Sequence, residues 1–109
     1  MIRRELSPII FVICNEGFTI ERFIHGMDAA YNDIQPWNYK DLVPAFGAKA
    51  GRYQTHQVRT KRQVEALFGD EGFNTARVLR FVEIYMPKED APVALRLVAE
   101  ASARNNAKQ

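Results

Sequence analysis

The stretch that decides the fold is Pro8-Ile9-Ile10-Phe11-Val12-Ile13, followed directly by Cys14-Asn15-Glu16-Gly17-Phe18-Thr19-Ile20-Glu21. The first six residues form an unbroken apolar run rich in β-branched side chains. Such a run predicts a strand buried on both faces, as in a parallel α/β sheet. In open α/β sheets, ligands bind just beyond the carboxyl ends of the strands. The polar residues and the glycine that follow the run therefore predict a ligand site.

Two oxygen atoms of this loop are suited to a small cation. The side-chain amide of Asn15 and the backbone carbonyl of Gly17 can point at one ion, and Mg²⁺ prefers such hard oxygen ligands. Glycine also lets the backbone turn sharply and approach the ion. A plain strand-to-helix turn uses the same residue types for backbone reasons alone. The spacing by itself therefore leaves both interpretations open.

The residues after the glycine predict the start of a helix. Thr19 can cap this helix, which places Glu21 in its first turn, beside the same crevice. A carboxyl group in that position could shuttle protons. The alternative is a first-turn acid that only interacts favourably with the helix dipole. Glu21 is therefore our candidate for the catalytic residue.

The rest of the chain alternates strand and helix patterns. Helices are predicted over residues 19–26, 39–46 and 61–68 and again after Asp90, with Asn38, Thr60 and Asp90 as caps. Further strands are predicted over residues 54–58 and 78–86, and residues 69–74 are predicted to be a loop. This order predicts an α/β fold with a partial parallel sheet of about three strands flanked by helices. A sheet that thin would expose a strand edge.

Composition limits the classes of protein. The chain has 109 residues, of which 47% are hydrophobic and 26% charged, as expected for a single globular domain. The basic residues Arg59, Lys61 and Arg62 lack the aromatic interleaving of a nucleic-acid surface, so we expect no nucleic-acid partner. No apolar run approaches the roughly 20 residues of a membrane span. A lone cysteine suits a reducing compartment, and we expect a cytoplasmic protein.

The octet Cys14–Glu21 resembles part of a known cofactor motif. It is similar to the second half of the thiamine-diphosphate motif of 2-keto acid decarboxylases of the pyruvate decarboxylase type, which usually reads Asn-Asn-Asp-Gly-Tyr-Thr-Ile-Glu. Cys14 and Glu16 depart from that pattern. The resemblance leans towards the fungal type and continues through Ile24-His25-Gly26, Tyr31-Asn32-Asp33-Ile34, Trp37, Pro44-Ala45-Phe46-Gly47-Ala48, Asp90-Ala91-Pro92 and Asn106-Ala107-Lys108-Gln109.

This resemblance implies an activity and a set of site residues. It implies non-oxidative decarboxylation of a 2-keto acid, pyruvate to acetaldehyde and CO₂ in the first instance, with thiamine diphosphate and Mg²⁺. Asn15 and Gly17 would bind the Mg²⁺, and Glu21 would be the catalytic residue that protonates the carbanion. The cofactor-binding residues would be Asn15, Gly17, Phe18, Thr19 and Ile20. Dimers paired into tetramers are implied for the full-length enzyme.

The resemblance also implies that part of the enzyme lies outside these residues. The family's motif begins with Gly-Asp-Gly about two dozen residues before the Asn, and its N-terminal and middle domains are absent here. We therefore expect residues 1–109 to be the C-terminal part of the thiamine-diphosphate domain, inactive alone. The alternative is a catalytically inactive association module that binds the full enzyme or itself. A flavodoxin-like nucleotide binder is disfavoured because a Gly-rich phosphate loop is missing.

Overall fold

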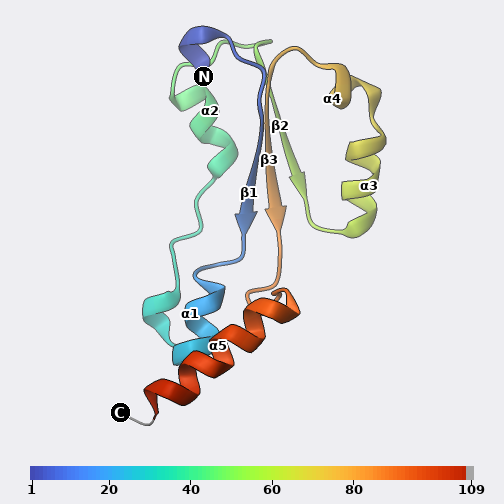
Figure 1. Ribbon diagram of the computed structural model, residues 1–109. Helices are drawn as coiled ribbons and strands as arrows, with labels where there is room; N and C mark the ends of the chain where they lie inside the picture. Colours follow the sequence, from blue (N-terminus) through green and yellow to red (C-terminus); the bar gives the residue numbers. More distant parts are fainter. Residues whose placement is uncertain (108–109) are drawn as a thin grey trace. The chain divides into compact units, whose positions relative to one another are not determined.

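The computed structural model describes residues 1–107 and has an α/β fold around a parallel sheet (Figure 1). The strands are β1 (Ile9–Cys14), β2 (Tyr53–Val58) and β3 (Leu79–Tyr85), in the order β1-β3-β2. Both edge strands pair parallel with β3. The predicted parallel sheet of three strands is confirmed.

The chain divides into two compact units, which are described separately. The first unit comprises residues 1–14 and 37–85 and contains the sheet. The second unit comprises residues 15–36 and the chain from Met86 onwards and is helical. No helix within residues 1–107 is both long and apolar enough to cross a bilayer.

Helices cover both faces of the sheet in the first unit (Figure 1). On one face, Val43 packs against Leu79 and Phe81 of β3. On the other face, Phe73 packs with Val58 and Val82. The first face carries the 3₁₀ turns η1 (Ile2–Arg4) and η3 (Tyr39–Asp41) with α2 (Leu42–Ala45), and the second carries α3 (Lys61–Gly69) and α4 (Glu71–Thr75).

The strand buried on both faces is β3, and the prediction that the first strand would be is wrong. β3 lies between the other two strands, and Val82 and Glu83 are fully buried. β1 lies at the edge, and its side chains alternate between half-buried and exposed. Ile13 is 59% exposed, whereas the α3–α4 layer buries Val58 of β2 and Val82 of β3 and meets β1 where the Phe68 ring contacts Phe11. The predicted exposed strand edge is confirmed.

Local signals account for α3 and for one missed helix. The Thr60 hydroxyl oxygen accepts a hydrogen bond from the Gln63 amide at 3.2 Å, so the predicted cap is confirmed. The predicted loop over residues 69–74 is wrong, because α4 occupies most of it. Asp70 caps this helix through the Phe73 amide at 2.9 Å, and burial of the Phe73 ring holds the short helix on the sheet.

Two further predicted caps are wrong. The side chain of Asn38 makes no capping hydrogen bond, and residues 39–46 form the turn η3 followed by the short helix α2. Asp90 does not cap the last helix either, because Pro92 precedes its first residue. Proline supplies a suitable backbone angle there without any side-chain hydrogen bond.

The second unit is built from α1 (Thr19–His25), the turn η2 (Ala30–Asn32) and α5 (Val93–Asn106). α1 packs against α5, where Ala99 is fully buried and the Arg96 guanidinium lies over the Phe23 ring at 5.5 Å. α5 extends to Asn106, and Lys108 and Gln109 of the matched tail lie outside the described residues.

Candidate functional site

The loop that follows β1 is fastened to a second segment of its own unit. The Phe18 amide donates to the Asn32 carbonyl at 3.1 Å, and the Ile34 amide donates to the Glu16 carbonyl at 3.1 Å. Gly17 and Asp33 thus form an isolated antiparallel bridge. Main-chain hydrogen bonds therefore hold residues 16–18 in one shape.

Only glycine fits at position 17 of this loop. Gly17 has φ +155°, and a Cβ atom there would lie 1.9 Å from the carbonyl oxygen of Asn32 and 2.7 Å from an Arg22 nitrogen. A side chain would therefore displace backbone as well as the guanidinium. The predicted sharp turn is present, and the close approach of two backbone segments is a reason for glycine independent of any metal.

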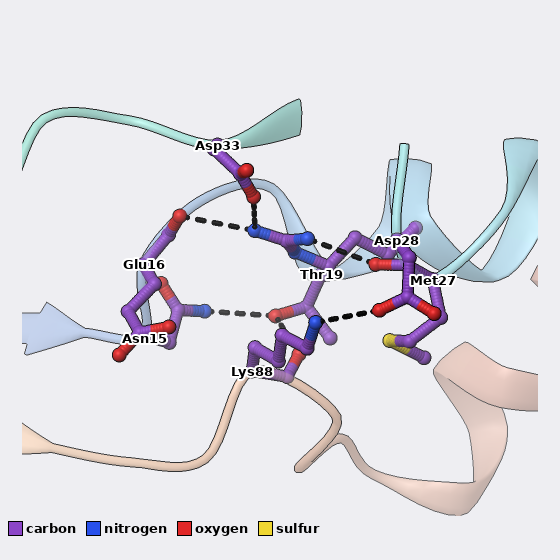
Figure 2. A network of polar contacts seen from close by, with 8 residues as sticks. Asn15, Glu16, Thr19, Met27, Asp28, Asp33 and Lys88 are labelled. Carbon is purple, nitrogen blue, oxygen red and sulfur yellow. Dashed lines mark hydrogen bonds and ion pairs between the residues drawn. The ribbon is translucent and has the colours of Figure 1, made fainter. Parts of the chain in front are cut away.

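The polar contacts around Thr19 orient the amide of Asn15, as Figure 2 shows. The Thr19 hydroxyl donates its one proton to the Lys88 carbonyl at 3.0 Å. The same hydroxyl oxygen lies 2.8 Å from the Asn15 amide, so Asn15 must present its NH₂ group as donor. The amide oxygen of Asn15 then faces away from Thr19. Within residues 1–107, neither this oxygen nor the Gly17 carbonyl oxygen accepts a hydrogen bond.

Arg22 fixes the loop, and sequence reasoning missed it. This side chain is 1% exposed and donates to the Glu16 carbonyl at 3.0 Å and to the Met27 carbonyl at 2.9 Å. It also forms an ion pair with Asp33. A signal was available, because Arg22 lies three residues after Thr19 and so shares its helix face. A charged residue on the inward face of a short helix indicates an internal partner.

Thr19 has a different role from the one predicted. Phe18, in extended backbone, is the N-cap residue of α1, and Thr19 is the first residue of the helix, where it is buried. Its hydroxyl is engaged by Asn15 and Lys88 and does not cap the helix. The cap prediction is therefore wrong, because a partner 69 positions away in the chain takes the hydroxyl.

Glu21 lies in the first turn of α1, as predicted. Its side chain is 46% exposed, and Oε2 lies 3.5 Å from Nε2 of His25, one turn along the helix. Ile20 is partly exposed and Phe18 is 56% exposed. The carboxyl group is therefore open to a ligand on one side and has a titratable imidazole on the other.

An ion pair holds the segment that accepts the Thr19 hydrogen bond. Lys88 Nζ lies 2.8 Å from the Asp28 carboxylate, and Figure 2 shows this contact beside Thr19. The hydrogen bond and charge of Lys88 lower the pKa of Asp28, and the same hydrogen bond raises the pKa of Lys88. The pair therefore persists from mildly acidic to alkaline pH and ties Lys88 to the loop after α1.

Comparison with known proteins finds relatives that match nearly the whole chain. No family model matches the chain. The chain is 53% identical over 107 residues to a pyruvate decarboxylase of Aspergillus terreus. This match covers 98% of the chain and 19% of the relative. The chain is similar to the fungal pyruvate decarboxylases. One from Aspergillus fumigatus is 58% identical over 106 residues, covering 97% of the chain and 18% of the relative. Pyruvate decarboxylase isozyme 3 of Saccharomyces cerevisiae is 45% identical over 109 residues, covering 100% of the chain and 19% of the relative.

The predicted resemblance to fungal-type pyruvate decarboxylases is thus confirmed over nearly the whole chain. The chain spans about a fifth of the length of these relatives. The match includes the loop from Asn15 to Glu21 and both helices of the second unit, since it covers at least 97% of the chain in the two Aspergillus comparisons.

Two other side chains that could carry chemistry, those of Cys14 and His56, are partly buried in the first unit. Within residues 1–107, no three His, Cys, Asp or Glu side chains gather as a metal site. The thiol of Cys14 is half-buried, and burial, aided by Glu83, raises its pKa, which disfavours a nucleophilic thiolate. His56 packs edge-on against Phe73 at 5.2 Å, and burial lowers the pKa of its imidazole.

Proposed function

We propose that this chain is part of a 2-keto acid decarboxylase that uses thiamine diphosphate and Mg²⁺, with pyruvate as its substrate. The observation that carries the proposal is the orientation of Asn15. Its NH₂ group is committed to Thr19, so the amide oxygen stays available, as does the Gly17 carbonyl, which accepts no hydrogen bond from residues 1–107. Two hard oxygen donors two residues apart fit Mg²⁺, which completes its octahedral shell with phosphate oxygens and water. The similarity to fungal pyruvate decarboxylases supports the same assignment.

The chain's own residues would hold the cofactor's diphosphate end through the metal. Asn15 and Gly17 would be the metal ligands, and the Arg22 contacts to Glu16 and Asp33 keep these two oxygens in place. Phe18, Thr19 and Ile20 would line the adjacent cofactor surface. When bound, thiamine diphosphate supplies the electron sink that loss of CO₂ requires.

Glu21 would be the proton donor to the bound substrate. In its protonated form, the half-exposed carboxyl group in the first turn of α1 would donate a proton to a substrate bound next to the loop, and His25, with Nε2 at 3.5 Å, would exchange protons with it. The same protonated carboxyl group would also donate a hydrogen bond to the substrate carboxylate and so help to orient it. Glu21 is therefore proposed as the catalytic residue of this stretch.

The complete enzyme would need residues that this chain does not contain. Because residues 1–109 match about a fifth of the relatives, we propose that they form the C-terminal part of a cofactor-binding domain within a longer polypeptide. The homodimers and tetramers expected for the full-length enzyme belong to the same proposal, as does a cytoplasmic location, which the lone cysteine favours.

A chimera tests this function directly. The 106 matching residues of the Aspergillus fumigatus pyruvate decarboxylase are replaced by those of this chain, and acetaldehyde formation from pyruvate is measured. We expect turnover within about tenfold of the parent, and loss of at least about a hundredfold in kcat for Glu21→Gln with the Mg²⁺ requirement unchanged. Asn15→Ala should instead raise the Mg²⁺ concentration needed for half-maximal activity.

The chimera has a matched control and a clear negative result. Asn38→Ala removes the same side chain at an exposed position that makes no capping hydrogen bond, and it should leave the activity unchanged. A chimera that assembles and binds cofactor but does not decarboxylate pyruvate, indolepyruvate or phenylpyruvate would refute the proposal. Unequal rates on these three acids would identify the substrate.

The alternative function is an association module. It is favoured by the apolar side chains that β1 exposes along its edge, since Ile9, Phe11 and Ile13 are 41%, 45% and 59% exposed. An unpaired strand edge with apolar side chains is a template for pairing with another chain. This function requires no turnover, and self-association of the isolated chain tests it.

A further inference from the structure

A cavity in the first unit, at the end of the sheet where the strands begin, has the chemistry of an anion site. It has a volume of about 280 Å³ and opens where β2 and β3 begin. Its polar lining comes from Arg3, Glu5, Lys49 and Arg52. Three cationic side chains against one anionic side chain give the cavity a net positive charge, although acidic and basic residues are nearly balanced over the whole chain.

The cationic groups of this cavity are only partly neutralised. Arg52 Nη2 lies 2.8 Å from Glu5 Oε2, in an ion pair whose side chains are 48% and 70% exposed. Arg3 and Lys49 take part in no ion pair among residues 1–107. The amide N–H groups of Lys49 and Val78, two further lining groups, donate no hydrogen bond within the same residues. The cavity therefore combines free cations with free backbone donors, the set that binds phosphate oxygens.

The other half of the lining is apolar, and it selects an organic ligand. Ile2, Leu6, Ala48, Val78 and Leu79 form this part of the wall. A free inorganic ion would leave it in contact with water, whereas a small organic group would cover it. A phosphate monoester carries a charge of about −1.5 to −2 near neutral pH, which matches the surplus of cations.

We propose that this cavity binds a small organic phosphate monoester, with Lys49 and Arg52 as its principal charged contacts and Arg3 at the rim. Glu5 competes with the ligand for Arg52. The site is independent of the decarboxylase proposal, because it uses none of the residues from Asn15 to Glu21.

The test is a titration of the ¹⁵N-labelled chain with phenyl phosphate, and separately with inorganic phosphate, at constant ionic strength set by chloride. We expect saturable shifts of the amides of Lys49, Arg52 and Val78, with phenyl phosphate binding more tightly than inorganic phosphate. Equal affinities would assign the site to free phosphate and overturn the monoester. Shifts that never saturate, or that appear equally on the α3 surface, would overturn the site altogether.

Charge variants with opposite expected signs make the test specific. Lys49→Gln should weaken phenyl phosphate binding about tenfold, because it removes a charge-assisted contact. Glu5→Gln should strengthen it several-fold, since it frees Arg52, and loss of folding could not produce such a gain. Arg62→Gln removes one positive charge from an exposed position on α3 that has no ion pair among the described residues, and it should have little effect. An equal loss in Arg62→Gln, or weaker binding in Glu5→Gln, would refute the proposal.

Discussion

At the scale of single residues, Gly17 is limited by a neighbouring backbone as well as by its own conformation. Gly17→Ala should destabilise the loop by about 3 kcal/mol, because the backbone strain of a positive φ adds to a clash with the Asn32 carbonyl. Hydrogen exchange at the Phe18 and Ile34 amides, whose hydrogen bonds flank Gly17, measures the loss.

Gly26 is the matched control for this substitution. It also has a positive φ, +118°, but a Cβ atom there would meet nothing within 4 Å. Gly26→Ala should therefore cost only the strain, about 1 kcal/mol. Equal effects of the two substitutions would mean that the clash at Gly17 relaxes without cost.

Arg22 is the residue whose loss should open the loop most. Arg22→Met should destabilise the second unit by about 3 kcal/mol, because the Glu16 and Met27 carbonyls lose a buried charged donor and Asp33 loses its partner. Asp33→Asn keeps an acceptor on a side chain that is 59% exposed, so we expect less than about 1 kcal/mol. Hydrogen-exchange rates of the Phe18 and Ile34 amides measure how much each variant destabilises the loop. A larger effect of Asp33→Asn than of Arg22→Met would contradict this account.

At the scale of elements, α3 depends on its first turn. Thr60 accepts from the Gln63 amide, and the Gln63 side chain in turn accepts from the Arg59 amide at 2.7 Å. Thr60→Ala should therefore destabilise α3 by about 1 kcal/mol. Asn38→Ala, at a predicted cap that makes no capping hydrogen bond, should cost almost nothing. Exchange of the α3 amides, compared with those of η3, distinguishes the two results.

The elements also show which sequence signals are reliable. β1 and β3 follow from apolar runs, and α3 follows from a capping threonine directly before apolar residues at helical spacing. The sequence does not predict α4 because its five residues carry too little periodicity, and the helix depends on burial of Phe73 against Val58 and Val82 together with the Asp70 cap. Thr19 does not cap α1 because its hydroxyl has partners elsewhere, and Asp90 does not cap α5 because Pro92 takes the N-cap position.

At the scale of the whole molecule, the exposed apolar side of β1 predicts association. If the association-module function holds, the chain should form dimers or larger species at high micromolar concentration in sedimentation experiments. Ile13→Lys should reduce this association at least about tenfold, because it places a charge on the exposed edge. Val93→Lys, at a residue that is 70% exposed on α5, is the control and should not. A chain that stays monomeric throughout, and that retains no full-length enzyme in a pull-down, would exclude the association module.

The sequence by itself determined the alternation of strands and helices, the parallel sheet, the loop that holds Asn15 and Gly17, and the place of Glu21 in the first turn of the next helix. These features depend on residues close together in the chain, where apolar runs, glycine and caps act locally. Only the tertiary structure decided that β3 and not β1 is the buried strand, because burial depends on the order β1-β3-β2. It also decided the orientation of the Asn15 amide and the burial of Arg22. The first depends on Lys88, 69 positions from Thr19, and a contact over that separation leaves no local signal in the sequence.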